Sequence, residues 1–168
     1  MTNMTKGKAI RTTLLALALS GVLAGTALAT GAVGFTSQLL AQGTTAGSVN
    51  FRTHSHGHPR QKIEFRTKGA VIFRTAQNTI VPGGSSGWHS HPGIVLVTVK
   101  AGTVTFYDED CSSNVYPTGA SFVEREGDGP GLARNEGTVE AVVVATFIEF
   151  PGTTAFRVDE ANPGCPQS

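Results

Sequence analysis

Charged residues are scarce in this sequence and do not cluster. Only 15% of the residues are Asp, Glu, Lys or Arg, and the 13 basic residues are nearly balanced by 12 acidic ones. Proteins that bind nucleic acid normally carry a basic patch or stripe that neutralises phosphates. Because the sequence has no such run of lysine and arginine, we expect no nucleic acid among its partners.

Several signatures of catalysis and nucleotide binding are also missing. The sequence has no serine in a nucleophile elbow, no Ser/His/Asp order and no glycine-rich phosphate loop followed by a helix. No window combines helical periodicity with helix caps. These absences argue against serine hydrolases, P-loop nucleotide-binding proteins and helical folds.

The first 29 residues predict a secretory signal peptide. A basic start, carried by Lys6, Lys8 and Arg11, precedes an uncharged and largely apolar run over residues 12–28. Ala27-Leu28-Ala29 then offers small residues at both positions that a signal peptidase reads. A transmembrane anchor is the alternative, but glycine and threonine interrupt the run before the ~20 apolar residues that span a bilayer. We therefore expect cleavage after Ala29, export from the cytoplasm and no stable membrane anchor.

Cysteine use agrees with export. The chain has two cysteines, Cys111 and Cys165, and neither has a His or Cys neighbour at metal-binding spacing. In an oxidising compartment such a pair usually forms a disulfide, whereas two free buried thiols are the alternative. The pair therefore predicts a structural bridge that ties the C-terminal tail to the domain.

After the predicted signal the chain has the pattern of an all-β protein. Residues 30–47 are rich in Gly, Thr, Ala and Gln, and we expect them to form a flexible arm. Residues 48–168 contain short, β-branched and alternating segments separated by Gly and Pro, which is typical of a β-sandwich or β-barrel. We expect one barrel domain over residues 48–168.

All five histidines fall in two places. His54, His56 and His58 form a His-x-His-x-His tract, and His89 and His91 form a His-x-His pair. Alternate residues of a strand point to the same face, so each set can present its imidazoles to one centre.

The segment around His89 and His91 resembles a known family. Gly83, five further residues, His89-x-His91 and then Gly102 resemble the first motif of the cupins, and the surrounding segment is similar to small exported cupins of the actinobacterial type. The similarity extends over about residues 82–150. It implies a cupin-type double-stranded β-helix, or jelly-roll barrel, and it says much less about function, because this fold hosts many activities.

The departures from the cupin pattern concern the metal ligands. The second motif is represented by Gly119, Gly127 and Asn135. Cupins take a Glu from the first motif and a His from the second as ligands beside the two histidines. Here the Glu position is Val95, and the second-motif His position is Gly131, or Pro130 when counted forward from Gly119. Two imidazoles alone make a weak site for Zn, Mn or Fe.

Two explanations of the histidines follow. In the first, His54, His56 and His58 lie near the barrel mouth and complete a site with His89 and His91, which would favour Cu, Ni or Zn. In the second, the barrel has lost its metal, and His89, His91 and Trp88 line a pocket for a small molecule. The incomplete ligand set favours the second explanation.

The expected function is therefore that of an exported cupin-domain protein that binds a small molecule, with a degenerate or absent metal site. The alternatives are a metal-dependent cupin enzyme of the oxygenase or isomerase type, and an extracytoplasmic binder of transition metals that uses both histidine sets. A small-molecule ligand is the expected partner, and a homodimer stays open.

Overall fold

The computed structural model describes residues 29–57 and 61–166, and this part of the chain forms strands without a helix. None of the described residues therefore belongs to a helix that could cross a membrane. The predicted signal peptide and His58 fall outside the described residues, apart from Ala29. The strands are β1 (Val33–Thr44), β2 (Asn50–His54), β3 (Lys62–Arg66), β4 (Ile72–Ser85), β5 (His89–Ser90), β6 (Ile94–Ala101), β7 (Thr103–Tyr107), β8 (Ser113–Pro117), β9 (Ser121–Arg125), β10 (Leu132–Arg134), β11 (Ala141–Glu149) and β12 (Val158–Asp159).

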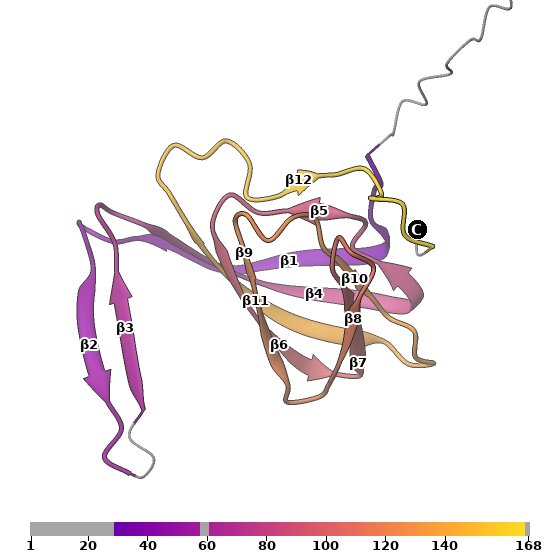
Figure 1. Ribbon diagram of the computed structural model, residues 1–168, viewed down its shortest axis with the longest axis horizontal. Helices are drawn as coiled ribbons and strands as arrows, with labels where there is room; N and C mark the ends of the chain where they lie inside the picture. Colours follow the sequence, from indigo (N-terminus) through magenta and orange to yellow (C-terminus); the bar gives the residue numbers. More distant parts are fainter. Residues whose placement is uncertain (1–28, 58–60, 167–168) are drawn as a thin grey trace, which may run out of the picture.

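Eight of these strands form one strongly curved antiparallel sheet (Figure 1). Its order is β8-β7-β10-β4-β11-β6-β9, and β1 also pairs with β4. The sheet curls until its first and last strands approach each other, since Tyr116 of β8 stacks on Phe122 of β9 with ring centroids 4.5 Å apart. The predicted all-β barrel is confirmed.

Strand alternation builds the core of this barrel. On β11 every second residue from Ala141 to Glu149 is buried, and on β6 the same holds for Val95, Val97 and Val99. Successive side chains of a strand point to opposite faces, and β-branched residues pack well on the half-buried surface. Burying this apolar face is the main favourable contribution to folding.

Strand β1 differs from the flexible arm that the sequence predicts for residues 30–47. It pairs with β4 along most of its length, from Phe35 opposite Ile80 to Thr44 opposite Ile72. Its side chains are almost all exposed. Backbone hydrogen bonds to β4 hold β1 in place. Because its side chains are mostly exposed, the sequence of β1 shows little of the hydrophobic alternation by which a strand is recognised.

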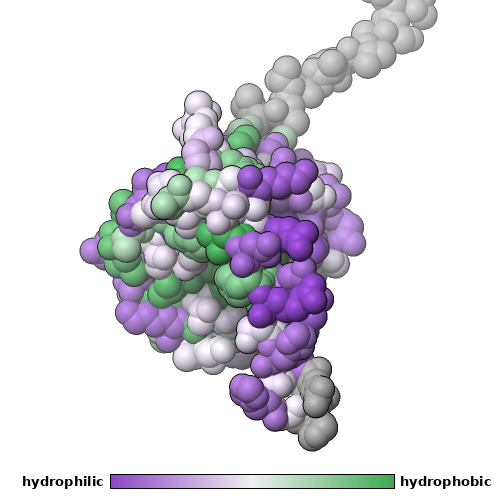
Figure 2. All heavy atoms as spheres, turned by 90° about the vertical axis from the view of Figure 1, so that its left-hand side faces the viewer, coloured by the Kyte–Doolittle hydropathy of each residue, from purple (hydrophilic) through white to green (hydrophobic). Residues whose placement is uncertain are grey.

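Strands β2 and β3 form a separate hairpin that projects from one end of the barrel (Figure 1). Phe51 lies opposite Phe65, and their rings stack with centroids 5.7 Å apart. The hairpin is exposed along nearly its whole length. Figure 2 views the molecule from this side and shows a band of hydrophilic residues beside a more hydrophobic area. The predicted domain of residues 48–168 thus includes a segment that lies outside the barrel.

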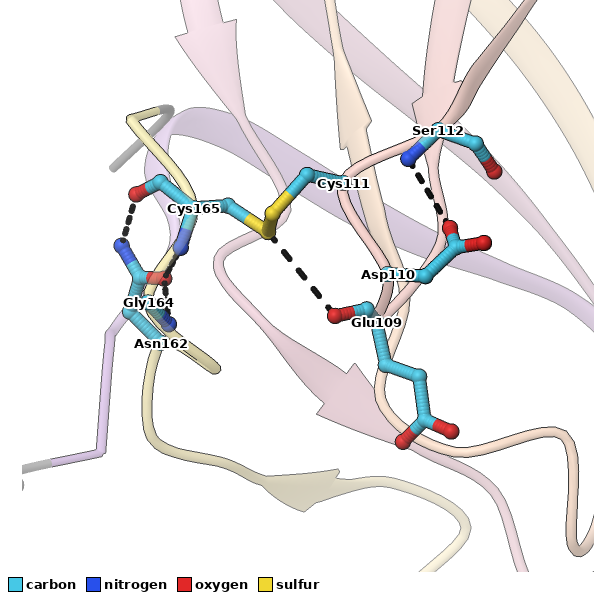
Figure 3. Close-up of a disulfide and its surroundings, with 7 residues drawn as sticks. All are labelled: Glu109, Asp110, Cys111, Ser112, Asn162, Gly164 and Cys165. Atoms are coloured by element: carbon cyan, nitrogen blue, oxygen red, sulfur yellow. Dashed lines mark hydrogen bonds between the residues drawn. A yellow bond between two sulfur atoms is a disulfide. The ribbon is translucent and has the colours of Figure 1, made fainter.

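The predicted disulfide between Cys111 and Cys165 is present, with an S–S distance of 2.03 Å (Figure 3). Asn162 shapes the tail beside it: its side-chain oxygen accepts hydrogen bonds from the amides of Gly164 and Cys165. Cys165 is buried in a small second core with Trp88, Tyr107 and Leu132. The bridge therefore fastens the C-terminal tail to the turn between β7 and β8.

Replacing both cysteines (Cys111→Ser with Cys165→Ser) should destabilise the protein. The bridge joins residues 54 positions apart, and closing a loop of that length stabilises by about 4 kcal/mol on the chain-entropy model. We expect the free energy of unfolding to fall by about 2–4 kcal/mol, measured by urea titration of the oxidised wild type and the variant. Equal denaturation midpoints would contradict a stabilising bridge.

Candidate metal centre

His89 and His91 lie inside the barrel at the end where strand β5 runs. Both side chains are buried. His89 also pairs with Gly131 through two backbone hydrogen bonds of 2.9 and 2.8 Å. The preceding turn contains Gly87 with a φ of +69°, where an added Cβ would meet the carbonyl oxygen of Thr30. The glycine thus allows the turn that brings both imidazoles into the barrel.

Backbone carbonyls fix the orientation of both imidazole rings. The Nδ1 atom of His89 lies 2.9 Å from the carbonyl oxygen of Gly87, and that of His91 lies 2.6 Å from the carbonyl oxygen of Phe156. A carbonyl oxygen can only accept, so each Nδ1 carries the proton in a neutral ring. Each Nε2 then presents a lone pair, which is the arrangement found in metal-binding histidines.

Glu124 of β9 supplies a carboxylate between these two lone pairs. Its Oε2 atom lies 3.6 Å from the Nε2 atom of His89 and 3.6 Å from that of His91. Glu124 pairs with Val95 of β6 across the sheet. Val95 occupies the Glu position of the cupin-like first motif, and the structure places a carboxylate directly opposite it on the neighbouring strand.

Burial controls the protonation of this cluster. It lowers the pKa of His89 to about 3, and the nearby Arg157 guanidinium and His91 act in the same direction. Burial also lowers the pKa of His91, against the hydrogen bond to Phe156. Burial raises the pKa of Glu124 to about 7, against the attraction of Arg157. Both histidines are therefore neutral at neutral pH.

The three side chains fit a divalent metal ion by distance and by chemistry. His89, His91 and Glu124 each offer one ligand atom, and these atoms all lie within 4.8 Å of one another. A separation of 3.6 Å is too long for a hydrogen bond. A metal about 2.1 Å from each tetrahedral ligand brings the ligand atoms to about 3.4 Å from one another. Two lone pairs and a carboxylate oxygen thus surround a place where a cation would satisfy all three.

The fourth ligand position of the cupin pattern holds no ligand. Gly131 stands there, and an added Cβ would meet the ring of Phe106. The Phe106 ring itself packs against Phe122, with centroids 5.0 Å apart. An apolar ring therefore fills the space beside Gly131, and the described residues offer three candidate ligands at this site.

A cavity of about 120 Å³ extends from the cluster into the barrel. Most of its walls are apolar, with Val95, Val97, Val104 and Phe147 among them. The polar residues of the wall are Ser37, Asn78, Ser86, His89, His91, Glu124 and Arg157. A small molecule in this cavity would contact both the three ligands and an apolar surface.

The other predicted site residues lie elsewhere. His54 ends strand β2 and is exposed on the projecting hairpin, as is His56 just beyond it. Within residues 29–57 and 61–166, the group of side chains that could hold a metal ion contains His89, His91 and Glu124, and neither His54 nor His56 belongs to it. Trp88 is fully buried in the second core against Tyr107 and Leu132. It is therefore not among the residues that line the cavity, where the sequence predicted it.

Sequence reasoning missed Glu124 and Arg157. For Glu124 a signal was available, because Phe122 and Glu124 are two residues apart in a predicted strand segment and therefore share one face of that strand. Phe122 is an aromatic residue expected in the core, so Glu124 follows it inward. Arg157 has no comparable signal, since it lies outside regular strands just before β12.

Comparison with known proteins gives structural matches only. No family model matches the chain, and no curated protein matches it. Among solved structures, an oxalate oxidase matches with 25% sequence identity and a TM-score of 0.41 over 47% of this chain and 46% of that one. The chain thus spans less than half the length of that protein.

Two further solved structures are similar to this chain over about half of its length. A Cupin_2 domain of an XRE family transcriptional regulator from Enterobacter cloacae is 22% identical, with a TM-score of 0.39 over 47% of this chain and 82% of that one. A Klebsiella pneumoniae protein with a double-stranded β-helix domain is 19% identical, with a TM-score of 0.45 over 52% of this chain and 75% of that one.

Substitution of Gly131 by alanine tests how tightly Phe106 fills the fourth position. We expect Gly131→Ala to lower the free energy of unfolding by about 1–3 kcal/mol, because the new Cβ overlaps the ring. Adding Phe106→Leu should recover part of the loss in a urea titration. Gly69→Ala is the control, since nothing lies within 4 Å of a Cβ added there. Equal losses at both glycines would contradict the tight packing.

Proposed function

We propose that this protein is an exported cupin-type barrel that holds a divalent transition metal on His89, His91 and Glu124 and binds a small molecule beside it. The observation that carries the proposal is the convergence of two imidazole lone pairs and one carboxylate oxygen at 3.6 Å. With Glu124 ionised, three acceptors face one another, and a cation between them would satisfy all three.

The ligand set argues for a particular group of metals. An all-imidazole site formed by both histidine sets, the alternative that the sequence left open, would favour Cu, Ni or Zn. Two histidines with one carboxylate suit Zn²⁺ and Fe²⁺, and the remaining coordination positions stay open for water or a ligand. Such an ion would supply Lewis acidity toward a bound oxygen atom.

The chain's own residues would perform the other tasks. Gly87 and Phe156 hold the two histidines by their carbonyl oxygens, as described above. The valine and phenylalanine walls keep bulk water away from a bound molecule, and a drier site strengthens its electrostatic interactions. Glu124 would release its proton when the metal binds, because ligands coordinate in the deprotonated form.

A barrel that binds a small molecule without metal is the second candidate. The missing second-motif histidine favours it, because Gly131 and Phe106 leave no fourth protein ligand. The metal measurement below separates the two candidates.

We also propose export with cleavage after Ala29. The basic and apolar N-terminus supports it, as does the disulfide, since such bridges persist in oxidising compartments. Thr30 would then be the first residue of the mature chain. Its amide nitrogen donates a hydrogen bond to the carbonyl oxygen of Glu160, and its hydroxyl accepts one from the amide of Trp88, both at 2.8 Å.

Metal affinity tests the proposed centre directly. Protein prepared without a histidine tag and stripped of metal should bind one equivalent of Zn²⁺ in competition with a chromophoric chelator. Glu124→Gln should weaken this binding at least about tenfold, because it removes the anionic ligand. His89→Ala with His91→Ala should abolish it.

Two controls accompany the metal measurement. Glu126→Gln changes the same charge two residues away and should bind Zn²⁺ as the wild type does. The triple change His54→Ala, His56→Ala and His58→Ala should leave the tight equivalent unchanged. Loss of that equivalent in the triple variant, or wild-type Zn²⁺ affinity in Glu124→Gln, would contradict the centre.

N-terminal processing tests export. Expressed with its full N-terminus in a bacterial host, the protein should leave the cytoplasm and begin at Thr30, as determined by intact mass spectrometry. Ala27→Glu with Ala29→Glu should block cleavage, because signal peptidases require small residues at these positions. If the wild-type protein stayed in the cytoplasm with its N-terminus uncleaved, the proposed export would be overturned.

A further inference from the structure

Arg157 brings a positive charge to the wall of the cavity beside the proposed metal centre. Its side chain is 20% exposed, and it lines the cavity together with the three ligands. The guanidinium lies close enough to lower the pKa of both His89 and Glu124. A cation in a partly buried and mostly apolar wall is costly unless it has a partner or a task.

The structure holds this guanidinium in a defined position. Its Nη2 atom donates to the carbonyl oxygen of Ser86 at 2.5 Å, and its Nε atom donates to Asp159 at 2.8 Å. Neither of these two hydrogen bonds, which are made to described residues, uses the Nη1 atom. Arg157 also follows Phe156, whose carbonyl oxygen orients His91. The guanidinium and the metal ligands are thus fixed relative to each other.

Charge balance at this end of the cavity favours an anion. With a divalent ion bound, Glu124 offsets one positive charge and leaves the ion and Arg157 in excess, since both histidines are neutral. Asp159 compensates Arg157 only partly, because its side chain is 52% exposed and therefore screened by water. The excess positive charge would attract an anionic group toward the ion and Arg157.

The apolar part of the cavity wall selects an apolar body for the same molecule. Phe35, Ile80, Val97 and Val143 line the cavity, and Phe147 continues this apolar surface up to the ring of His91, with centroids 5.4 Å apart. We propose that the ligand of this site is a small carboxylate with a compact apolar body, and that Arg157 determines the preference for a carboxylate. This inference rests on the proposed function for the metal. Arg157 and the apolar walls are residues of the chain, so they are present whether or not a metal ion is bound.

Binding of an isosteric acid and amide tests the inference. Isobutyrate and isobutyramide have the same apolar body and differ in charge. Their affinities for the full mature protein can be measured by NMR titration, once with Zn²⁺ and once after metal removal. We expect the acid to bind about tenfold more tightly than the amide, since a charge-assisted hydrogen bond is stronger than a neutral one.

Variants at position 157 assign the preference to this side chain. Arg157→Gln should reduce the acid-to-amide ratio to near one, and Arg157→Lys should retain part of it. Arg66→Gln removes an exposed hairpin arginine and should keep the wild-type ratio. If Arg157→Gln does not fold, the ratios of the wild type and Arg157→Lys still test the inference.

The outcomes separate this inference from the proposed function. A wild-type ratio near one, no binding of either probe, or an unchanged ratio in Arg157→Gln would overturn the role of Arg157. Chelator competition in the same samples reports Zn²⁺ binding independently. An acid preference that depends on Arg157 in protein without Zn²⁺ affinity would uphold the inference while refuting the metal centre.

Discussion

The register between β6 and β9 is the constraint on which the candidate site depends. Glu124 faces His89 and His91 because it lies opposite Val95, and a slip of one residue would turn its side chain to the outer face. Phe122 secures this register from the same face, since it stacks on Tyr116. The contact that brings the ends of the curved sheet together therefore also holds the carboxylate in place.

How much could be predicted from the sequence differs between the barrel and its site. The strands β6 and β11 follow from their β-branched content, and the disulfide follows from the cysteine count and the expected compartment. Strand β1 escaped prediction because its pairing uses backbone groups, which every residue type possesses. Glu124 was overlooked because counting along the first motif looks for the ligand on β6, whereas the neighbouring strand supplies it. The face shared with Phe122 indicates that Glu124 points inward, and the pairing of β9 with β6 places it opposite Val95.

Residue spacing alone does not distinguish the two histidine sets. His54 and His89 each belong to a His-x-His pattern, so alternation predicts shared faces for both. What distinguishes them is the surroundings of each imidazole: His89 has a buried carbonyl for its Nδ1 atom, whereas His54 lies exposed on the hairpin. An imidazole with a fixed tautomer is prepared for coordination, and a solvated one must be ordered first. The surroundings follow from tertiary structure and are absent from the spacing.

The tail fastened by Cys165 has a consequence for the order of assembly. The carbonyl of Phe156 and the guanidinium of Arg157 both lie near the C-terminus, just before β12, which pairs with β5. The buried residues of the main barrel core end at Phe147. A chain that emerges N-terminus first therefore presents this whole core before the residues that orient His91 and carry the guanidinium of the cavity wall.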